Sequence, residues 1–123
     1  MIKNLFLVAI GGATGSALRY LVHILVTKKY QVQFPYQTLL VNIIGCLLIG
    51  LLVGYFSKFD GEHNSLKLLL ITGFCGGFTT FSAFGLENIN FIQSHNYWLA
   101  LQYTLLSIVL GVLAVSIGIF ITK

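Results

Sequence analysis

The sequence predicts an all-α integral membrane protein with four transmembrane helices. Of its 123 residues, 57 % are hydrophobic and only 8 % are charged, and the mean hydropathy is +0.91. A soluble domain carries roughly 25 % charged residues, so this chain lacks the side chains for a water-facing surface. Four apolar stretches, about 4–26, 36–57, 66–92 and 97–122, each reach the roughly 20 residues that cross a bilayer. We therefore expect residues 1–123 to form one four-helix membrane domain.

The connections between the four stretches are short. They read KKYQVQF, FDGEHNS and SHN. Short hairpins make neighbouring helices antiparallel, so both termini should lie on one side of the membrane. A chain of 123 residues supplies few walls for an internal cavity. Any route across the membrane through this protein is therefore expected to need more than one copy.

The basic side chains form no cluster, although the formal net charge is +4. They fall near the ends of the stretches, where long basic side chains reach the lipid headgroups. This scatter does not favour nucleic acid as a partner. Their near-even division between the two sides gives the positive-inside rule little to act on, which predicts copies in both orientations. The residues are Lys3, Arg19, Lys28, Lys29, Lys58, Lys67 and Lys123.

The first stretch contains GGATGSALRY at residues 11–20. Gly11 and Gly15 have the GxxxG spacing that lets two helices approach closely in lipid. Arg19 is the one strong charge of this stretch, and charge within a span indicates function by default. Because Arg19 lies near the end of the span, a structural or anchoring role is favoured over direct contact with an anion. His23, one turn further on, is expected to be a hydrogen-bonded interface histidine.

The second and fourth stretches each carry a polar pair at helical spacing. Thr38 and Asn42 are four residues apart and share a face, as do Tyr103 and Ser107. An asparagine deep among Leu, Val and Ile must find a partner for its amide. That partner is either another helix, in a hydrogen bond of about 0.6 kcal/mol, or an anion in a pathway. Ser107 has the further option of bonding to a carbonyl of its own helix.

The third stretch contains GFCGGFTTFSAFG at residues 73–85, a poor helix former because of its glycines and threonines. A helix interrupted here would free backbone groups, which the membrane tolerates only inside protein or beside a wet cavity. Freed carbonyls can bind a small cation, and a new helix N-terminus favours an anion. Phe81 and Phe84 share a face beyond this point. Their electropositive ring edges suit an anion, although lipid-facing phenylalanine is the more common pattern.

Several chemistries are missing from the pattern. The first, second and fourth stretches hold no acidic residue; Asp60 and Glu62 fall in a connection, and Glu87 lies beyond the expected break. A proton-coupled exporter needs a titratable group in its pathway. No cluster has metal-ligand spacing, and no nucleophile stands with a base. An enzyme is therefore not expected. Cys46 and Cys75 both fall inside spans, which argues against a disulfide framework.

At these residues the sequence resembles the Fluc/CrcB family of fluoride channels. GGATGSALRY, TLLVNIIG and GFCGGFTTFSAF carry the resemblance, which extends over essentially the whole chain. It implies an antiparallel, dual-topology homodimer of four-helix subunits with a broken third helix, in the inner (plasma) membrane. It implies a fluoride pathway and a structural sodium ion on the dimer axis, held by backbone oxygens of Gly76 and Thr79. The pathway residues it implies are Asn42, Phe81 and Phe84, and with them the polar residues Thr38, Tyr103 and Ser107.

Two positions depart from the pattern of that family. Ala83 stands where a second threonine is common, and Gln37 stands where a glycine is usual. Neither is a residue assigned to the ion pathway. The function that the resemblance implies is passive, fluoride-selective export that relieves fluoride toxicity. The alternatives are a small four-span multidrug exporter, which would need a membrane carboxylate early in the chain, and a non-conducting scaffold.

Overall fold

The structure, a computed structural model, describes residues 1–29, 33–59 and 61–123; Asp60, expected in a connection, lies outside the described residues. Within those ranges every regular element is helical. Four helices are long and apolar enough to cross a membrane: Ile2–Lys29, Tyr36–Phe56, Asn64–Gln93 and Tyr97–Thr122. The predicted all-α, multi-pass membrane fold is thus confirmed. The elements are α1 (Ile2–Lys29), α2 (Tyr36–Phe56), α3 (Asn64–Lys67), the π-helix η1 (Leu68–Cys75), α4 (Gly76–Phe78), α5 (Phe81–Gln93) and α6 (Tyr97–Thr122).

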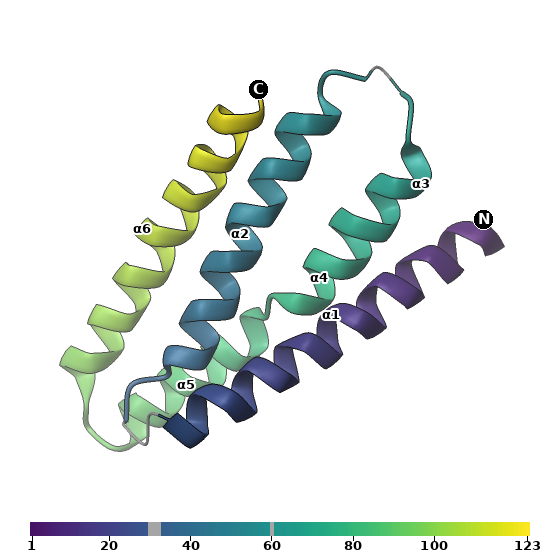
Figure 1. Cartoon of the computed structure of the whole chain (residues 1–123). Helices are drawn as coiled ribbons and strands as arrows, with labels where there is room; N and C mark the ends of the chain where they lie inside the picture. The colour runs from purple at the N-terminus through teal and green to yellow at the C-terminus, as the bar shows by residue number, and fades with distance from the viewer. Residues whose placement is uncertain (30–32, 60) are drawn as a thin grey trace.

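The four spans run up and down beside one another (Figure 1). The end of α1, the start of α2 and the turn between α5 and α6 lie at the lower end of the view, whereas the C-terminus lies at the top. The N-terminus lies at the far end of the tilted α1, away from that lower end. α2 and α6 form one closely packed pair, and α1 with η1 and α4 forms the other. α5 joins the pairs by packing on α6.

Glycines set the distance between α1 and the third span. A Cβ atom on Gly11 would collide with the carbonyl oxygen of Leu69, and one on Gly15 would collide with that of Phe74. A Cβ on Gly77 would in turn meet the backbone of Gly12. The backbones therefore touch, as the GxxxG spacing predicted. This close approach brings the C-terminal half of α1 alongside the residues of α4.

Glycines also set the close distance between α2 and α6. A Cβ on Gly50 would collide with the carbonyl oxygen of Val115, and one on Gly118 would lie 2.6 Å from the backbone nitrogen of Leu51. Near the shared end of the two helices, Gly54 leaves room for the side chain of Thr122. In lipid such van der Waals packing replaces the hydrophobic drive that water would supply. α2 and α6 are thus held at a fixed distance, and they carry the polar pairs noted above.

The third span is not one regular helix. Its middle part, Leu68–Cys75, is a π-helix, which is rare at this length. After α4 the backbone becomes extended at Thr79 (φ −83°, ψ 157°) and Thr80 (φ −148°, ψ 121°), and α5 begins at Phe81. The Thr80 hydroxyl caps α5 by accepting from the Ala83 N–H over 3.1 Å. The glycine- and threonine-rich stretch therefore ends one helical segment and starts another.

The glycine crossing generates a stability prediction. We expect Gly15→Ala to lower the apparent Tm of the detergent-purified protein, because its methyl group must push two backbones apart, at a cost of about 1–3 kcal/mol. The matched control is Gly85→Ala, since nothing lies within 4 Å of a Cβ at Gly85. Equal Tm values for the two variants would contradict the packing assigned to α1.

Candidate functional site

The interruption between α4 and α5 is held by Asn42 of α2. The Asn42 Nδ2 atom donates to the Thr80 carbonyl over 3.0 Å, and the Thr80 N–H donates to Asn42 Oδ1 over 2.8 Å. This reciprocal pair fixes which end of the amide is oxygen. It also satisfies both backbone groups of Thr80, which no helix serves. Asn42 therefore makes the interhelical contact that the sequence left open, and one amide hydrogen remains for another acceptor.

Arg19 of α1 serves the same interruption from the opposite side. Its Nε donates to the carbonyl oxygen of Gly77 over 3.1 Å. In a continuous helix the donor to that oxygen would be the amide of Phe81, four residues on. Arg19 thus supplies a donor where the regular ladder stops, which fits a structural role. A guanidinium has five N–H groups, so four remain for other acceptors.

Two carbonyl oxygens at the interruption lose their regular helical donors. The i+4 donor for Gly76 would be the Thr80 N–H, which goes to Asn42. The i+4 donor for Thr79 would be the Ala83 N–H, which goes to the Thr80 hydroxyl. Gly76 also lies exposed on the surface of the single chain. The oxygens of Gly76 and Thr79 are therefore free of the donors that helices give to carbonyls elsewhere.

A cavity of about 290 Å³ lies where α2, α5 and α6 face one another beside the interruption. We call it the phenylalanine cavity. Both rings predicted to share a face line it, with 5.7 Å between the centroids of Phe81 and Phe84. Phe81 is 82 % exposed in the single chain. The lining residues that the sequence analysis had proposed for the site are Asn42, Thr79, Phe81, Phe84 and Ser107.

Ser107 places at the phenylalanine cavity a hydroxyl group without a hydrogen-bond partner in the described part of the chain. Its hydroxyl oxygen is buried, yet it has no hydrogen-bond partner among the described residues. The option of bonding to its own helix is therefore not taken, whereas Ser116 of the same helix does bond to the carbonyl of Val112. A buried hydroxyl without a partner costs about 1–3 kcal/mol. The Ser107 hydroxyl is therefore a polar group of this cavity that no described residue of the chain uses.

Thr38 and Tyr103 both contact the carboxylate of Glu87, a residue that the sequence pattern did not connect with either of them. The Thr38 hydroxyl donates to Glu87 Oε2 over 2.9 Å, and the Tyr103 hydroxyl donates to Glu87 Oε1 over 3.1 Å. Thr38 and Tyr103 are both buried. The spacing of Phe84 and Glu87, three residues apart on α5, was the available signal for a shared face. Glu87 is thus a member of the polar seam that links α2, α5 and α6.

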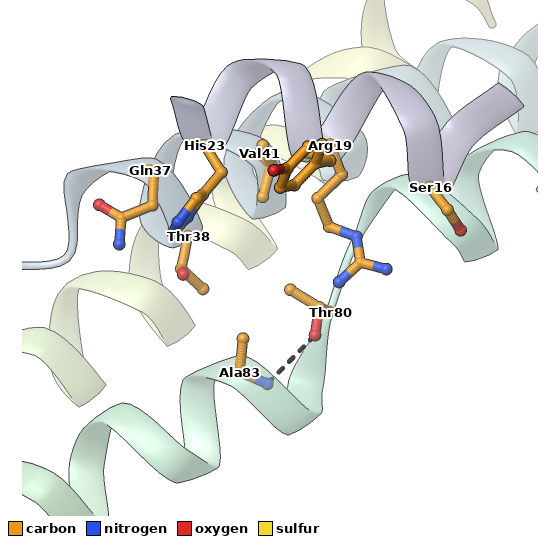
Figure 2. A pocket seen from close by; sticks show the side chains of 9 residues that line it. Ser16, Arg19, His23, Gln37, Thr38, Val41, Thr80 and Ala83 are labelled. Carbon is orange, nitrogen blue, oxygen red and sulfur yellow. Dashed lines mark hydrogen bonds between the residues drawn. The ribbon is translucent and has the colours of Figure 1, made fainter. Parts of the chain in front are cut away.

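A second cavity, of about 330 Å³, lies on the other side of the interruption, between α1, α2 and α5. We call it the basic cavity. Figure 2 shows Arg19 and His23 projecting into it from α1, with the guanidinium of Arg19 extending towards Thr80. Gln37 and Thr38 line it from α2. Among the described residues that line it, none is acidic.

The cavities adjoin through shared residues. Thr80 lines both the basic cavity and the phenylalanine cavity, so the Asn42–Thr80 hydrogen bonds lie at their partition. Gln37 lines both the basic cavity and a third one, of about 260 Å³, near the start of α2. Glu87 and Asn90 of α5 line this third cavity. Polar residues of this chain therefore line three adjoining cavities, from the start of α2 to the middle of the third span.

The site residues expected from the sequence thus divide into two groups. Asn42, Phe81, Phe84 and Ser107 share the phenylalanine cavity, whereas Thr38 and Tyr103 lie at Glu87 and do not line that cavity. In the part of the chain that the structure describes, no three His, Cys, Asp or Glu side chains are grouped to hold a metal ion. Cys46 and Cys75 are free thiols.

Comparisons with known proteins show the family to which the chain belongs. Residues 6–119 match the family model described as CrcB-like protein, Camphor Resistance (CrcB). Proteins named fluoride-specific ion channel FluC are similar over almost their whole length. The one from Flavobacterium psychrophilum is 49 % identical over 98 % of both chains. That from Azobacteroides pseudotrichonymphae is 44 % identical over 100 % of this chain and 98 % of the relative. That from Phocaeicola vulgatus is 41 % identical over 98 % and 99 %. The chain therefore belongs to the CrcB family, as the resemblance of its glycine- and phenylalanine-rich motifs predicted.

Proposed function

We propose that this chain is a passive, fluoride-selective ion channel that lets fluoride leave the cell and so relieves its toxicity. The relatives that it matches over nearly their full length are named fluoride-specific channels. The chain is a multi-pass membrane protein of the CrcB family, and its role is transport rather than catalysis. We place it in the inner (plasma) membrane.

The observation that carries this proposal is the convergence of anion-compatible groups in the phenylalanine cavity. Fluoride is small and strongly hydrated, so a selective pathway must replace its water with closely placed donors. The orphaned hydroxyl of Ser107 and the remaining amide hydrogen of Asn42 are such donors. Phe81 and Phe84 add electropositive ring edges. Chloride is larger and fits the same donors less well.

The working unit in this proposal is an antiparallel homodimer with one subunit in each orientation. The phenylalanine cavity is open at the surface of the single chain, and Phe81 is 82 % exposed there. A second copy placed over this face would cover the ring and complete the walls of the pathway. The same cavity is also lined by the apolar residues Cys46, Ile49 and Ile108, which suit packing against another helix in lipid.

The cofactor in this proposal is one structural sodium ion per dimer. The carbonyl oxygens of Gly76 and Thr79 lack their helical donors, and small hard cations take such oxygens as ligands. Each subunit would provide the same two oxygens at the dimer axis. The sodium would then neutralise carbonyl dipoles that the interruption of the third helix leaves at the centre of the membrane.

A proton-coupled exporter is the second candidate, because Glu87 lies within the polar seam. A coupling carboxylate must exchange protons with water during transport. Here both oxygens of Glu87 accept hydrogen bonds from hydroxyl groups of neighbouring helices. The two candidates differ in energetics: the channel needs only a fluoride gradient, whereas the exporter needs a proton gradient.

Fluoride efflux from liposomes tests the function directly. We expect the purified protein to release fluoride with no ATP and no proton gradient, and with little release of chloride. Phe81→Ile should reduce fluoride release by about tenfold, because the volume is roughly kept and only the ring edge is lost. The exposure of Phe81 means that this change leaves the subunit core intact.

The matched control for that experiment is Phe120→Ile, since Phe120 of α6 is 85 % exposed and does not line the phenylalanine cavity. We expect it to conduct like the parent protein. Release by Phe81→Ile as fast as by the parent would remove the ring from the pathway. A parent that releases no fluoride, or only with a proton gradient, would remove the channel itself.

Dual topology is tested by reporters fused to the C-terminus. We expect both a periplasm-active and a cytoplasm-active reporter to give signal from the same chain, since the basic residues do not favour one orientation. Three lysines added after Lys123 should shift the population to one orientation and lower fluoride release. Signal on only one side from the unmodified chain would contradict the antiparallel dimer.

Sodium binding is tested by thermal unfolding of the purified dimer. Sodium should raise the Tm by about 3–5 °C relative to an organic cation, and potassium should do so much less. The effect should be the same between about pH 6 and pH 8, because the expected ligands are uncharged carbonyl oxygens. An equal response to sodium and potassium, or a steep dependence on pH, would exclude the carbonyl site.

A further inference from the structure

The basic cavity contains a titratable residue for which the pathway described above has no use. His23 lies one helical turn after Arg19 on α1, and both side chains line this cavity (Figure 2). Its ring stacks on that of Tyr20, with 6.5 Å between the centroids and 13° between the planes. His23 is exposed at the surface of the single chain, so the ring reaches the open side of the cavity. Histidine is the side chain whose charge changes between about pH 5 and pH 8.

The charges around His23 determine what its protonation does. From α1 the neighbouring groups are Arg19, which is always charged, and Tyr20. From α2 they are Gln37 and Thr38, which are neutral. From the third span they are Thr80 and Ala83, which are neutral, and the carboxyl group of Glu87 accepts a hydrogen bond from the Thr38 hydroxyl.

Arg19 is therefore the one permanent charge among the described residues that line the basic cavity. Tyr103 of α6 adds only a neutral hydroxyl, which donates to Glu87. Protonation of His23 adds a second positive charge to that of Arg19 in this cavity. That charge stands on the side of Thr80 opposite the phenylalanine cavity.

We propose that His23 is an anion-attracting residue of the basic cavity, which serves as an antechamber to the phenylalanine cavity and captures small anions better when His23 is protonated. This inference rests on the proposed function of the chain as a fluoride channel. A cleft lined by charge of one sign raises the local concentration of the opposite ion, and it raises the rate of capture. The partition at Thr80 then separates capture on one side from selection on the other.

The test is the pH dependence of fluoride release at fluoride concentrations far below saturation, with equal pH inside and outside the liposomes. Release by protein-free liposomes at each pH is subtracted, because neutral hydrogen fluoride crosses lipid unaided. We expect the rate of the parent to rise by about threefold to tenfold between about pH 8 and pH 5.5. The maximal rate at saturating fluoride should change much less, since capture no longer limits it.

Three variants assign this effect to one residue. His23→Gln should give a flat profile at the low rate, and His23→Lys should give a flat profile at the high rate. His95→Gln should keep the profile of the parent, because His95 lies in the turn before α6, beside Tyr97, and does not line the basic cavity. Elution as a dimer in size-exclusion chromatography checks the fold of each variant.

The outcomes separate this inference from the function on which it rests. A parent that conducts fluoride with a flat profile, or a His23→Gln variant that keeps the profile of the parent, overturns the role of His23 and leaves the channel standing. A change only in the maximal rate also overturns it, because capture would not be the step affected. A parent that conducts no fluoride at any pH overturns the proposed function.

Discussion

The structure depends on one constraint: backbone groups freed inside a membrane must find partners. At Thr79 and Thr80 the third span leaves the helical conformation, and lipid offers nothing to the amides and carbonyls released there. Side chains supply the missing partners. Asn42 takes both groups of Thr80, and Arg19 takes the carbonyl of Gly77. α1 and α2 must therefore stand beside the interruption at fixed distances, which the glycine contacts of α1 and the packing of α2 on α6 provide.

The helical part of this fold could be predicted from composition and period. Residues in four long apolar stretches had no alternative in a bilayer, and the GxxxG spacing of Gly11 and Gly15 predicted the close crossing that the structure has. Helical spacing and residue chemistry made Asn42 and Phe81 candidates, whereas their assignment to a fluoride pathway came from the motif resemblance. Both lie at the phenylalanine cavity, although their contact with an ion stays a prediction.

Hydrogen bonds between side chains of different spans could not be predicted, because they depend on how the helices rotate and cross. Glu87 had no evident partner in the sequence, yet in the structure it accepts hydrogen bonds from Thr38 and Tyr103. The π-helical form of Leu68–Cys75 had no signal in its run of apolar residues either, since helical period alone does not separate i+4 from i+5 bonding. The same holds for the basic cavity, whose lining comes from α1, α2 and α5.

A count of donors separates the groups that hold the fold from those left for an ion. The Asn42 amide accepts one hydrogen bond from Thr80 and donates another to it. Arg19 donates one of its five N–H groups to the Gly77 carbonyl. The hydroxyls of Thr38 and Tyr103 both donate to Glu87. What remains is the hydroxyl of Ser107, one amide hydrogen of Asn42 and the outer face of the guanidinium. The first two face the phenylalanine cavity and the third faces the basic cavity, with Thr80 between them. The unused donors therefore lie on two sides of Thr80, whose backbone Asn42 holds through two hydrogen bonds.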